Sequence, residues 1–246
     1  MAKFTDRKKE DVLKAVRASL EREPMVNLHR YPIQMDYEDG VLILEGEAER
    51  LAAKKVAMEL AAAVPGVTGI VDRLCVVPSH RMGDGAVLDG VRDAFLAEPA
   101  LENCTLRLRS KGKVETVREA LSDPHGDMEV SVQDGVVLLD NTVVNRAQKR
   151  LAGALAWWVP GARNVVNGLE VLAPEEDNDD EMTDAVRMIL EKNRFIDAGQ
   201  IRVIARNYVV TLEGLVRTES QKAMAENDAW SVFDVDKVVN RLKVQR

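Results

Sequence analysis

Residues 145–158, NRAQKRLAGALAWW, carry basic and aromatic side chains at a spacing suited to binding an anionic group. On a helix, Trp157 shares a face with Arg150 and Arg146, seven and eleven positions before it, and Lys149 adds a nearby positive charge. An indole beside guanidiniums suits contact with anionic phospholipid headgroups or with an acidic protein partner. The alternative is that Trp157 fills a crevice between structural units, with the arginines lying over it.

A second basic group alternates along the chain as Arg107, Arg109, Lys111 and Lys113. Such a row could contact lipid phosphates or nucleic acid. We favour a solvated hairpin, whose like charges along an exposed edge discourage edge-to-edge aggregation. Contact with lipid phosphates or nucleic acid is the alternative.

Catalytic or metal-binding spacing is absent from the sequence. Cys75 and Cys104 form no CxxC pair, and no histidine is placed to activate Cys104 as a nucleophile. We therefore expect no catalytic residue, no metal and no cofactor, and the one enzymatic alternative is a site formed between structural units. The three histidines stand singly in expected loops: His29, His80 and His125.

Composition narrows the class of protein. The 246 residues are 46% hydrophobic and 30% charged, which excludes a disordered chain. The net charge of −7 argues against a global electrostatic grip on nucleic acid. The longest apolar-rich stretch, residues 151–159, is too short to span a membrane, and the N-terminus lacks the apolar segment of a signal peptide. As the sequence stands we expect a cytoplasmic protein, and a periplasmic one only if a leader was removed.

Three segments, starting at Asp39, Asp134 and Asn207, align without gaps over about thirty-six residues, which predicts a triplicated unit. In each, an alternating strand leads through a tight turn into a nearly continuous apolar strand. A strand that is apolar on both faces is expected to be covered on both. We expect helices of its own unit on one face and a neighbouring unit or a partner on the other.

A helix follows each apolar strand, at about 49–63, 143–159 and 217–231, and a final strand closes the unit. Four glycines are expected to make structural turns: Gly40 and Gly135 in the hairpins, and Gly66 and Gly161 after the helices. The third copy has Phe233-Asp234 in place of Pro-Gly, which predicts a different helix exit.

An opening helix precedes each unit, but the middle one is ambiguous. Residues 87–97 and 113–121 both have helical periodicity, with a strand-like alternation at 106–109 between them. We favour an insertion at about 102–126 over a truncated extra half-unit. Linkers are expected at 78–85 and at the acidic run 174–181, which we interpret as a solvated tether.

The pattern resembles the BON-domain family. Its Asp-Gly-Val-Val-x-Leu-x-Gly hairpin, its helix with a central Lys or Arg and its closing Asn-x-Leu strand are carried here by residues such as Asp39, Leu44, Gly46, Asn167 and Leu169. The resemblance implies an α+β fold of three tandem αββαβ units, each a three-stranded mixed sheet with two helices on one face. We expect units at 1–78, at 85–173 with the insertion, and at 180–246.

The same resemblance implies a non-catalytic, phospholipid-binding module of bacterial envelope and osmotic-stress proteins. We therefore expect a binding or scaffold protein that contacts anionic phospholipid through Arg146, Lys149, Arg150 and Trp157, with Arg107, Arg109 and Lys111 as a second basic group. The alternative is a protein–protein assembly module that uses sheet faces for self-association or for docking a client.

Overall fold

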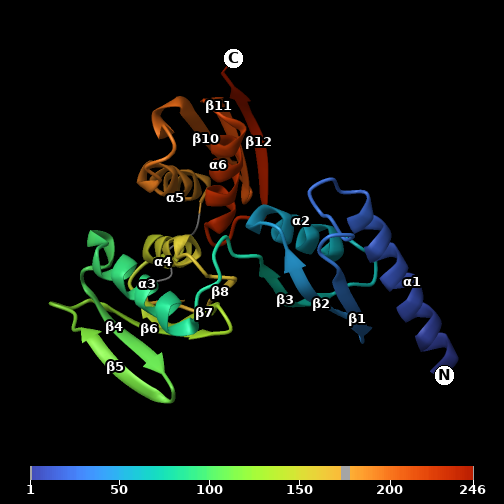
Figure 1. Cartoon of the computed structure of the whole chain (residues 1–246), viewed down its shortest axis with the longest axis horizontal. Helices are drawn as coiled ribbons and strands as arrows, with labels where there is room; N and C mark the ends of the chain where they lie inside the picture. Colours follow the sequence, from blue (N-terminus) through green and yellow to red (C-terminus); the bar gives the residue numbers. More distant parts are fainter. Residues whose placement is uncertain (1, 173–177, 246) are drawn as a thin grey trace. The chain divides into compact units, whose positions relative to one another are not determined.

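The computed structural model describes residues 2–172 and 178–245 and divides the chain into two compact units, Met1–Val77 and Pro78–Arg246. The fold is α+β with three domains, whose mixed sheets contain three, six and three strands (Figure 1). The first unit holds one domain and the second unit holds two.

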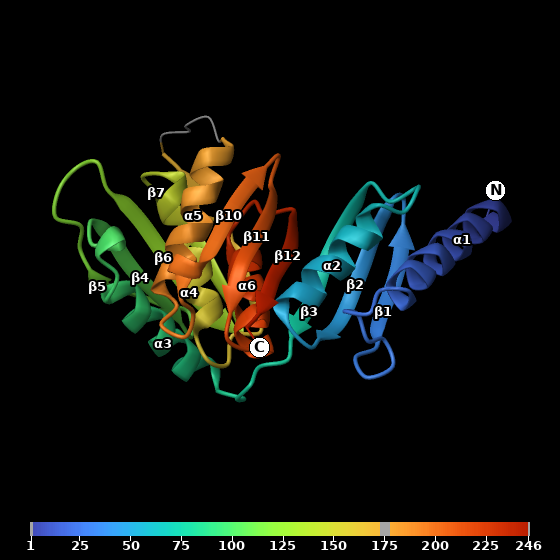
Figure 2. The same cartoon turned by 90° about the horizontal axis from the view of Figure 1, so that it is seen from above.

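The first domain has the element order α1 (Ala2–Glu21), β1 (Ile33–Glu38), β2 (Val41–Ala48), α2 (Leu51–Ala62) and β3 (Gly69–Val76). Strand β2 pairs antiparallel with β1 and parallel with β3. Both helices pack on one face of the sheet, and Figure 2 shows α2 lying in front of the strands. Apolar residues at helical spacing on α1 meet alternate residues of the strands in one core: Val12, Val16, Leu20, Ile33, Leu42, Leu44 and Leu74.

A buried ion pair lies inside this first domain. Lys54 on α2 is 2% exposed, and its Nζ lies 2.8 Å from Oδ2 of Asp72 and donates a hydrogen bond to the Leu74 carbonyl oxygen at 2.7 Å. In the other two domains asparagine replaces the aspartate, and Asn167 and Asn240 donate instead to helix carbonyls. The inward polar residue of each closing strand therefore ties that strand to the helix.

The second domain contains α3 (Asp84–Leu96), β4 (Cys104–Ser110), β5 (Lys113–Arg118), β6 (Gly126–Gln133), β7 (Val136–Val143), α4 (Arg146–Trp158), β8 (Asn164–Asn167) and β9 (Glu170–Val171), with a short 3-10 helix, η1 (Pro99–Leu101). Its strands run in the order β5-β4-β6-β7-β8, and β9 also pairs with β7. This sheet is larger than the three-stranded one expected, because the β4–β5 hairpin adds two strands beside β6.

The sequence-based helix at 113–121 is therefore wrong, since residues 113–118 form β5. Their apolar side chains recur at helical spacing, but pairing with the alternating strand β4 decides the structure. The expected linker at 78–85 also ends earlier, because α3 starts at Asp84. The Asp84 carboxylate accepts hydrogen bonds from the backbone N–H groups of Asp134 and Gly135, so it anchors the β6–β7 turn.

The third domain contains α5 (Asp179–Lys192), a 3-10 helix η2 (Ala198–Gln200), β10 (Ile201–Arg206), β11 (Val209–Val216), α6 (Glu219–Ser231) and β12 (Lys237–Val244). Its sheet repeats the pattern of the first: β11 lies between antiparallel β10 and parallel β12. Residues 174–177 of the expected acidic tether lie outside the described residues. The remainder begins α5, where Asn178 caps the helix by accepting from the Glu181 N–H and the acidic first turn suits the helix dipole.

The turns confirm the sequence pattern except at one helix exit. Gly40, Gly66, Gly135 and Gly161 all have positive φ, as a left-handed turn position requires. The different exit expected after the third helix is wrong. Asp234 takes a φ of +70° in the place of glycine, and the cap residues Val159 and Val232 have nearly equal backbone angles.

Candidate functional site

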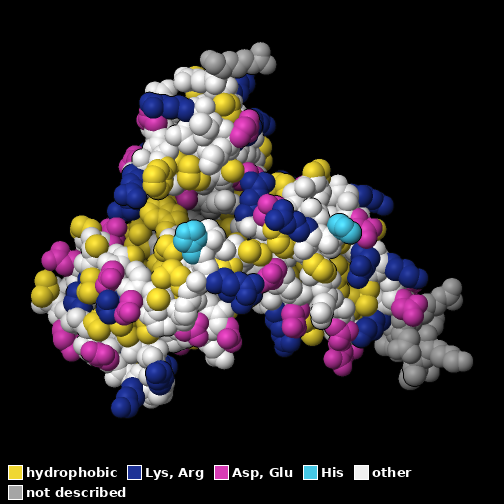
Figure 3. All heavy atoms as spheres, in the orientation of Figure 1, with side chains coloured by type: hydrophobic (Ala, Val, Ile, Leu, Met, Phe, Trp, Pro, Cys, Tyr) yellow, Lys and Arg dark blue, Asp and Glu magenta, His cyan; other side chains and the backbone are white. Residues whose placement is uncertain are grey.

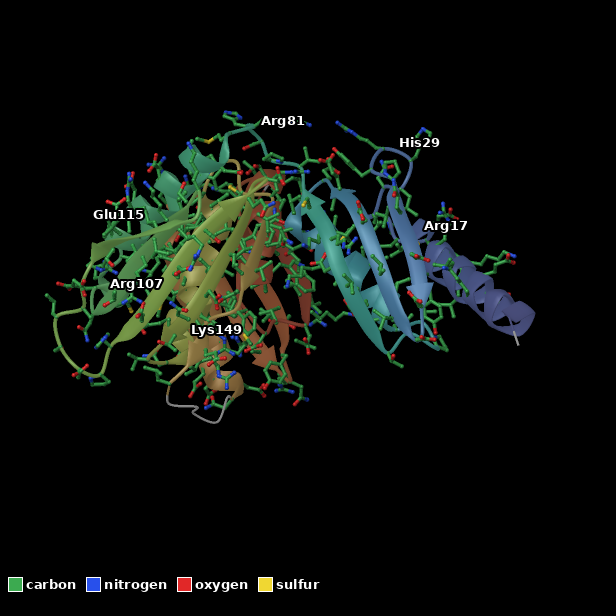
Figure 4. All side chains as sticks on the ribbon, turned by 90° about the horizontal axis from the view of Figure 1, so that it is seen from below. Arg17, His29, Arg81, Arg107, Glu115 and Lys149 are labelled. Carbon is green, nitrogen blue, oxygen red and sulfur yellow. The ribbon has the colours of Figure 1, made fainter. Side chains whose placement is uncertain are left out.

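The faces of the three sheets that the helices leave uncovered are the main candidate surfaces. On each central strand the inward residues are buried beneath the helices, as Leu44, Leu139 and Leu212 show. The outward residues are not: Val41 is 37% exposed, Leu138 is 39% exposed and Leu215 is 40% exposed. Figure 4, drawn from below, shows the strands of the first domain in front of its helices.

The second cover was expected from a neighbouring unit or a partner, and the outward residues of the central strands are instead exposed in the structure. Within the described residues, the helices of each domain pack on a single face of its sheet. Exposed apolar side chains on the solvent face of a sheet are typical of an interaction surface. In a strand with one face in water, the residues that point to the solvent are polar. We call these surfaces the open faces.

The predicted anionic site on α4 is instead a contact between the second and third domains. Arg150 is only 2% exposed, and its Nε donates to the Phe233 carbonyl oxygen at 3.3 Å. Arg146 pairs with Asp234 at 3.3 Å, and the Lys149 ammonium lies 4.1 Å from the centre of the Phe233 ring. Desolvation lowers the pKa of Lys149.

The prediction that Arg150 contacts lipid at the surface is therefore wrong, because its guanidinium is enclosed between α4 and the loop after α6. Trp157 is half-buried. On the face drawn in Figure 3, hydrophobic side chains gather over α4 and α5. Helix α4 packs against α3 of its own domain and against α5 and α6 of the next, which explains why residues around most of its circumference are buried.

A buried carboxylate completes the contact between these two domains. Asp228 on α6 accepts hydrogen bonds from Trp158 Nε1 at 3.0 Å and from Asn193 Nδ2 at 2.6 Å. Burial raises its pKa to about 6, against the two hydrogen bonds, which lower it. The sequence analysis missed this residue. Its signal was the spacing of Ala225, Asp228 and Val232, which places a carboxylate within an inward row.

The second basic group lies on the outer strands of the middle sheet. Arg107 pairs with Asp127, and Arg109 pairs with Glu129 through two hydrogen bonds, so carboxylates of β6 compensate both guanidiniums. Lys111 lies in the exposed turn between β4 and β5 with a φ of +49°. Figure 4 shows Arg107 over the strands of the middle sheet.

In the described part of the chain, no three His, Cys, Asp or Glu side chains cluster so as to hold a metal ion. Cys104 is buried, and burial raises the pKa of its thiol, which opposes the thiolate form a nucleophile needs. None of the helices within 2–172 and 178–245 has the length and hydrophobicity of a membrane span.

The family model described as BON domain matches three segments of the chain: residues 8–78, 114–173 and 178–246. The chain belongs to the BON-domain family. BON domains are known for binding and scaffold roles, and the family is in general non-catalytic. The second match begins within β5, so it leaves out β4 and also α3, whose apolar face packs on β6 in this BON protein.

No curated protein matches the chain. Solved structures similar to it include the C-terminal domain of CdsD, "the structural protein of the Type III secretion system of Chlamydia trachomatis". That structure shares 12% identity over 96% of this chain and 98% of that chain, with a TM-score of 0.25. Another CdsD structure shares 13% identity over 96% and 92% of the two chains, with a TM-score of 0.24. These TM-scores are too low to indicate a function.

Proposed function

We propose that this BON protein is a non-catalytic assembly module that docks protein partners through its open faces. The observation that carries the proposal is the exposure of apolar side chains on the outward side of each central strand. Covering one Val or Leu side chain by a partner removes apolar area from water and is worth about 1–2 kcal/mol. Several such side chains on a rigid sheet make a preorganised docking surface, because no backbone ordering is needed on binding.

Contacts within the chain favour this role over lipid binding through α4. The basic residues of that helix already hold the third domain, and Arg107 and Arg109 already pair with carboxylates. Each of these groups would have to give up a partner to bind a headgroup. Binding at the apolar side chains of the open faces breaks no ion pair, since these side chains only give up contact with water.

Photo-crosslinking in the native host tests the proposal. A photoreactive amino acid replaces Val71 on β3 or Val166 on β8, two exposed apolar residues of open faces, and Leu121 in an exposed loop is the matched control. We expect protein adducts from the two sheet positions at least five-fold above those from Leu121. Equal yields at all three positions, or adducts to lipid alone, would contradict docking through the open faces.

Contact with anionic phospholipid through the turn between β4 and β5 is a second candidate. Lys111 and Lys113 are exposed at this turn, and Val114 beside them is an exposed apolar residue. Each lysine near an anionic surface contributes about 1 kcal/mol, so this contact alone is weak. Flotation with phosphatidylserine vesicles should lose most of any bound protein in the K111E/K113E variant. Unchanged flotation of that variant would remove this candidate.

A further inference from the structure

The open face of the first domain is acidic. Strand register places alternate residues of β1, β2 and β3 on this face, around the apolar centre formed by Val41, Ile43 and Val71. One guanidinium, Arg73, belongs to it and pairs with Glu45 at 3.5 Å, and the ammonium of Lys9 on α1 pairs with Asp36 at 2.5 Å, so carboxylates still outnumber cations on this face. Its four carboxylates are those of Asp36, Glu38, Glu45 and Glu47.

The open face of the third domain is basic at the corresponding strands. Alternate residues of β10, β11 and β12 surround an apolar centre formed by Ile204, Val239 and Leu215. Its single carboxylate, Glu213, pairs with Arg241 at 3.2 Å. Its five cationic side chains are those of Arg202, Arg206, Lys237, Arg241 and Lys243.

The two faces therefore share the same strand order and are opposite in charge. Both are three-stranded sheets with the same strand order and pairing, and both have an apolar centre bounded by charged residues. The middle sheet lacks this polarity, because Asp127 and Glu129 compensate Arg107 and Arg109 on it. Opposite charges at an interface favour encounter and fix its register.

We infer that the acidic face of one copy docks on the basic face of a second copy, so that the chain assembles head to tail. The inference rests on the proposed function and deepens it by naming the partner as another copy of the same chain. Pairing of two identical faces is disfavoured, since it would bring carboxylates against carboxylates or guanidiniums against guanidiniums. In a dimer joined by two different faces, one copy still has a free acidic face and the other a free basic face. Further copies can therefore add at both ends.

Sheet dimensions limit how tight this contact can be. Three strands spaced about 4.8 Å apart, with eight residues at about 3.3 Å each, present on the order of 400 Å² per copy. That area is at the low end for specific interfaces and corresponds to a transient contact. We therefore expect association that appears at high protein concentration and weakens strongly with salt, because exposed charges are screened over about 10 Å at 0.1 M ionic strength.

Sedimentation velocity of the full chain at low salt, over increasing concentration, tests the inference. An acidic-face variant, E38Q/E45Q, and a basic-face variant, R206Q/K243Q, each remove charge from one face without creating the opposite charge. We expect the wild type to form a concentration-dependent series beyond the dimer, and each variant alone to lose at least ten-fold in association. A 1:1 mixture of the two variants should form a heterodimer and nothing larger, because each still carries one intact face of opposite sign. The controls E10Q/E21Q, on exposed positions of α1, and R187Q/R217Q, on exposed positions in the third domain, should assemble like the wild type.

A wild type that stays monomeric at all concentrations and salts would overturn the head-to-tail inference, while crosslinks from Val71 and Val166 to another protein would leave the proposed function standing. Assembly that survives both face variants, or a series that stops at a dimer, would also overturn it. A third result would overturn it: the R206Q/K243Q variant no longer binds phosphatidylserine vesicles that the wild type binds, but its self-association is unchanged. The basic face would then bind lipid and not a second copy. Adducts from Val71 that join only copies of this chain, together with charge-dependent assembly, would confine docking to copies of this chain.

Discussion

The ammonium of Lys54 lies 2.8 Å from the carboxylate of Asp72 inside the first domain, where the lysine side chain is almost fully enclosed. Desolvation lowers the pKa of Lys54, and the neighbouring carboxylate opposes that shift. The pair belongs to the first domain alone, since asparagine stands at the corresponding strand positions of the other two.

Replacing Asp72 by Asn should destabilise the first domain by about 2 kcal/mol. The substitution keeps the size of the side chain but leaves the buried ammonium without its counter-charge. Hydrogen exchange of the β2 and β3 amides in the full chain measures this loss. Glu45→Gln, which removes the carboxylate of the exposed pair with Arg73, should change exchange by less than about 0.5 kcal/mol. Equal effects of the two variants would show that the buried Lys54–Asp72 pair contributes no more to stability than the exposed Arg73–Glu45 pair.

The stability of the third domain should fall as pH rises from about 4 to about 6. The folded pKa of Asp228 is raised to about 6 from an ordinary 3.8, so the folded domain holds a proton that the unfolded chain releases. The stabilising contribution is full below pH 4, is lost through pH 6, and amounts to about 3 kcal/mol. The pH dependence of denaturant unfolding, compared between wild type and Asp228→Asn, measures it. The variant should lack this slope whatever its absolute stability, and an unchanged slope would assign the pH dependence to other groups.

Replacing Arg150 by Ala should loosen the third domain from α4 by about 3 kcal/mol. The change removes the donor to the Phe233 carbonyl oxygen and leaves a cavity at an enclosed position. Faster hydrogen exchange in α5 and α6 would report it. Arg146→Ala, at a partly exposed position, should cost less than half as much. A larger effect from Arg146 than from Arg150 would contradict the central position of Arg150 in this contact.

Gly161→Ala should destabilise the second domain by about 2 kcal/mol. Its φ of +90° disfavours any L side chain, and an added Cβ would lie 2.8 Å from Cβ of Met82 and 2.9 Å from Cγ2 of Val87. Gly85→Ala is the matched control, because it lies in α3 with open space around it and should stabilise the helix by about 0.5–1 kcal/mol. Opposite shifts of the two midpoints in urea denaturation are expected. A neutral Gly161→Ala would mean that the turn can change its backbone conformation freely.

Local sequence signals were sufficient for most of the elements. Asp39-Gly40 and Asp134-Gly135 specify tight hairpins, and the spacing of Val12, Val16 and Leu20 specifies a helix, because each depends on residues near one another in the chain. Residues 113–118 were assigned wrongly as a helix since their structure depends on pairing with β4, a tertiary contact that periodicity does not contain.

The location of the surfaces was harder to predict, because exposure depends on what other domains cover. Arg150 has the sequence context of a surface guanidinium, yet a loop eighty-three residues away encloses it. The roles of Asp228 and Phe233 in the contact between the second and third domains were likewise hidden, because they depend on packing between domains. The charges of the open faces, by contrast, were present in the strand alternation of β1 and β10, and strand register was needed to bring them together with those of β3 and β12.

Helix α4 is enclosed by its own domain and by the next, and this packing limits where the chain can be divided. The boundary after Val77 separates the two compact units, and the second and third domains lie together in the second unit. A break between the second and third domains would expose Arg150 and Trp158 and leave Asp228 with Asn193 as its one remaining donor among those described above. Truncation between the second and third domains should therefore yield insoluble fragments.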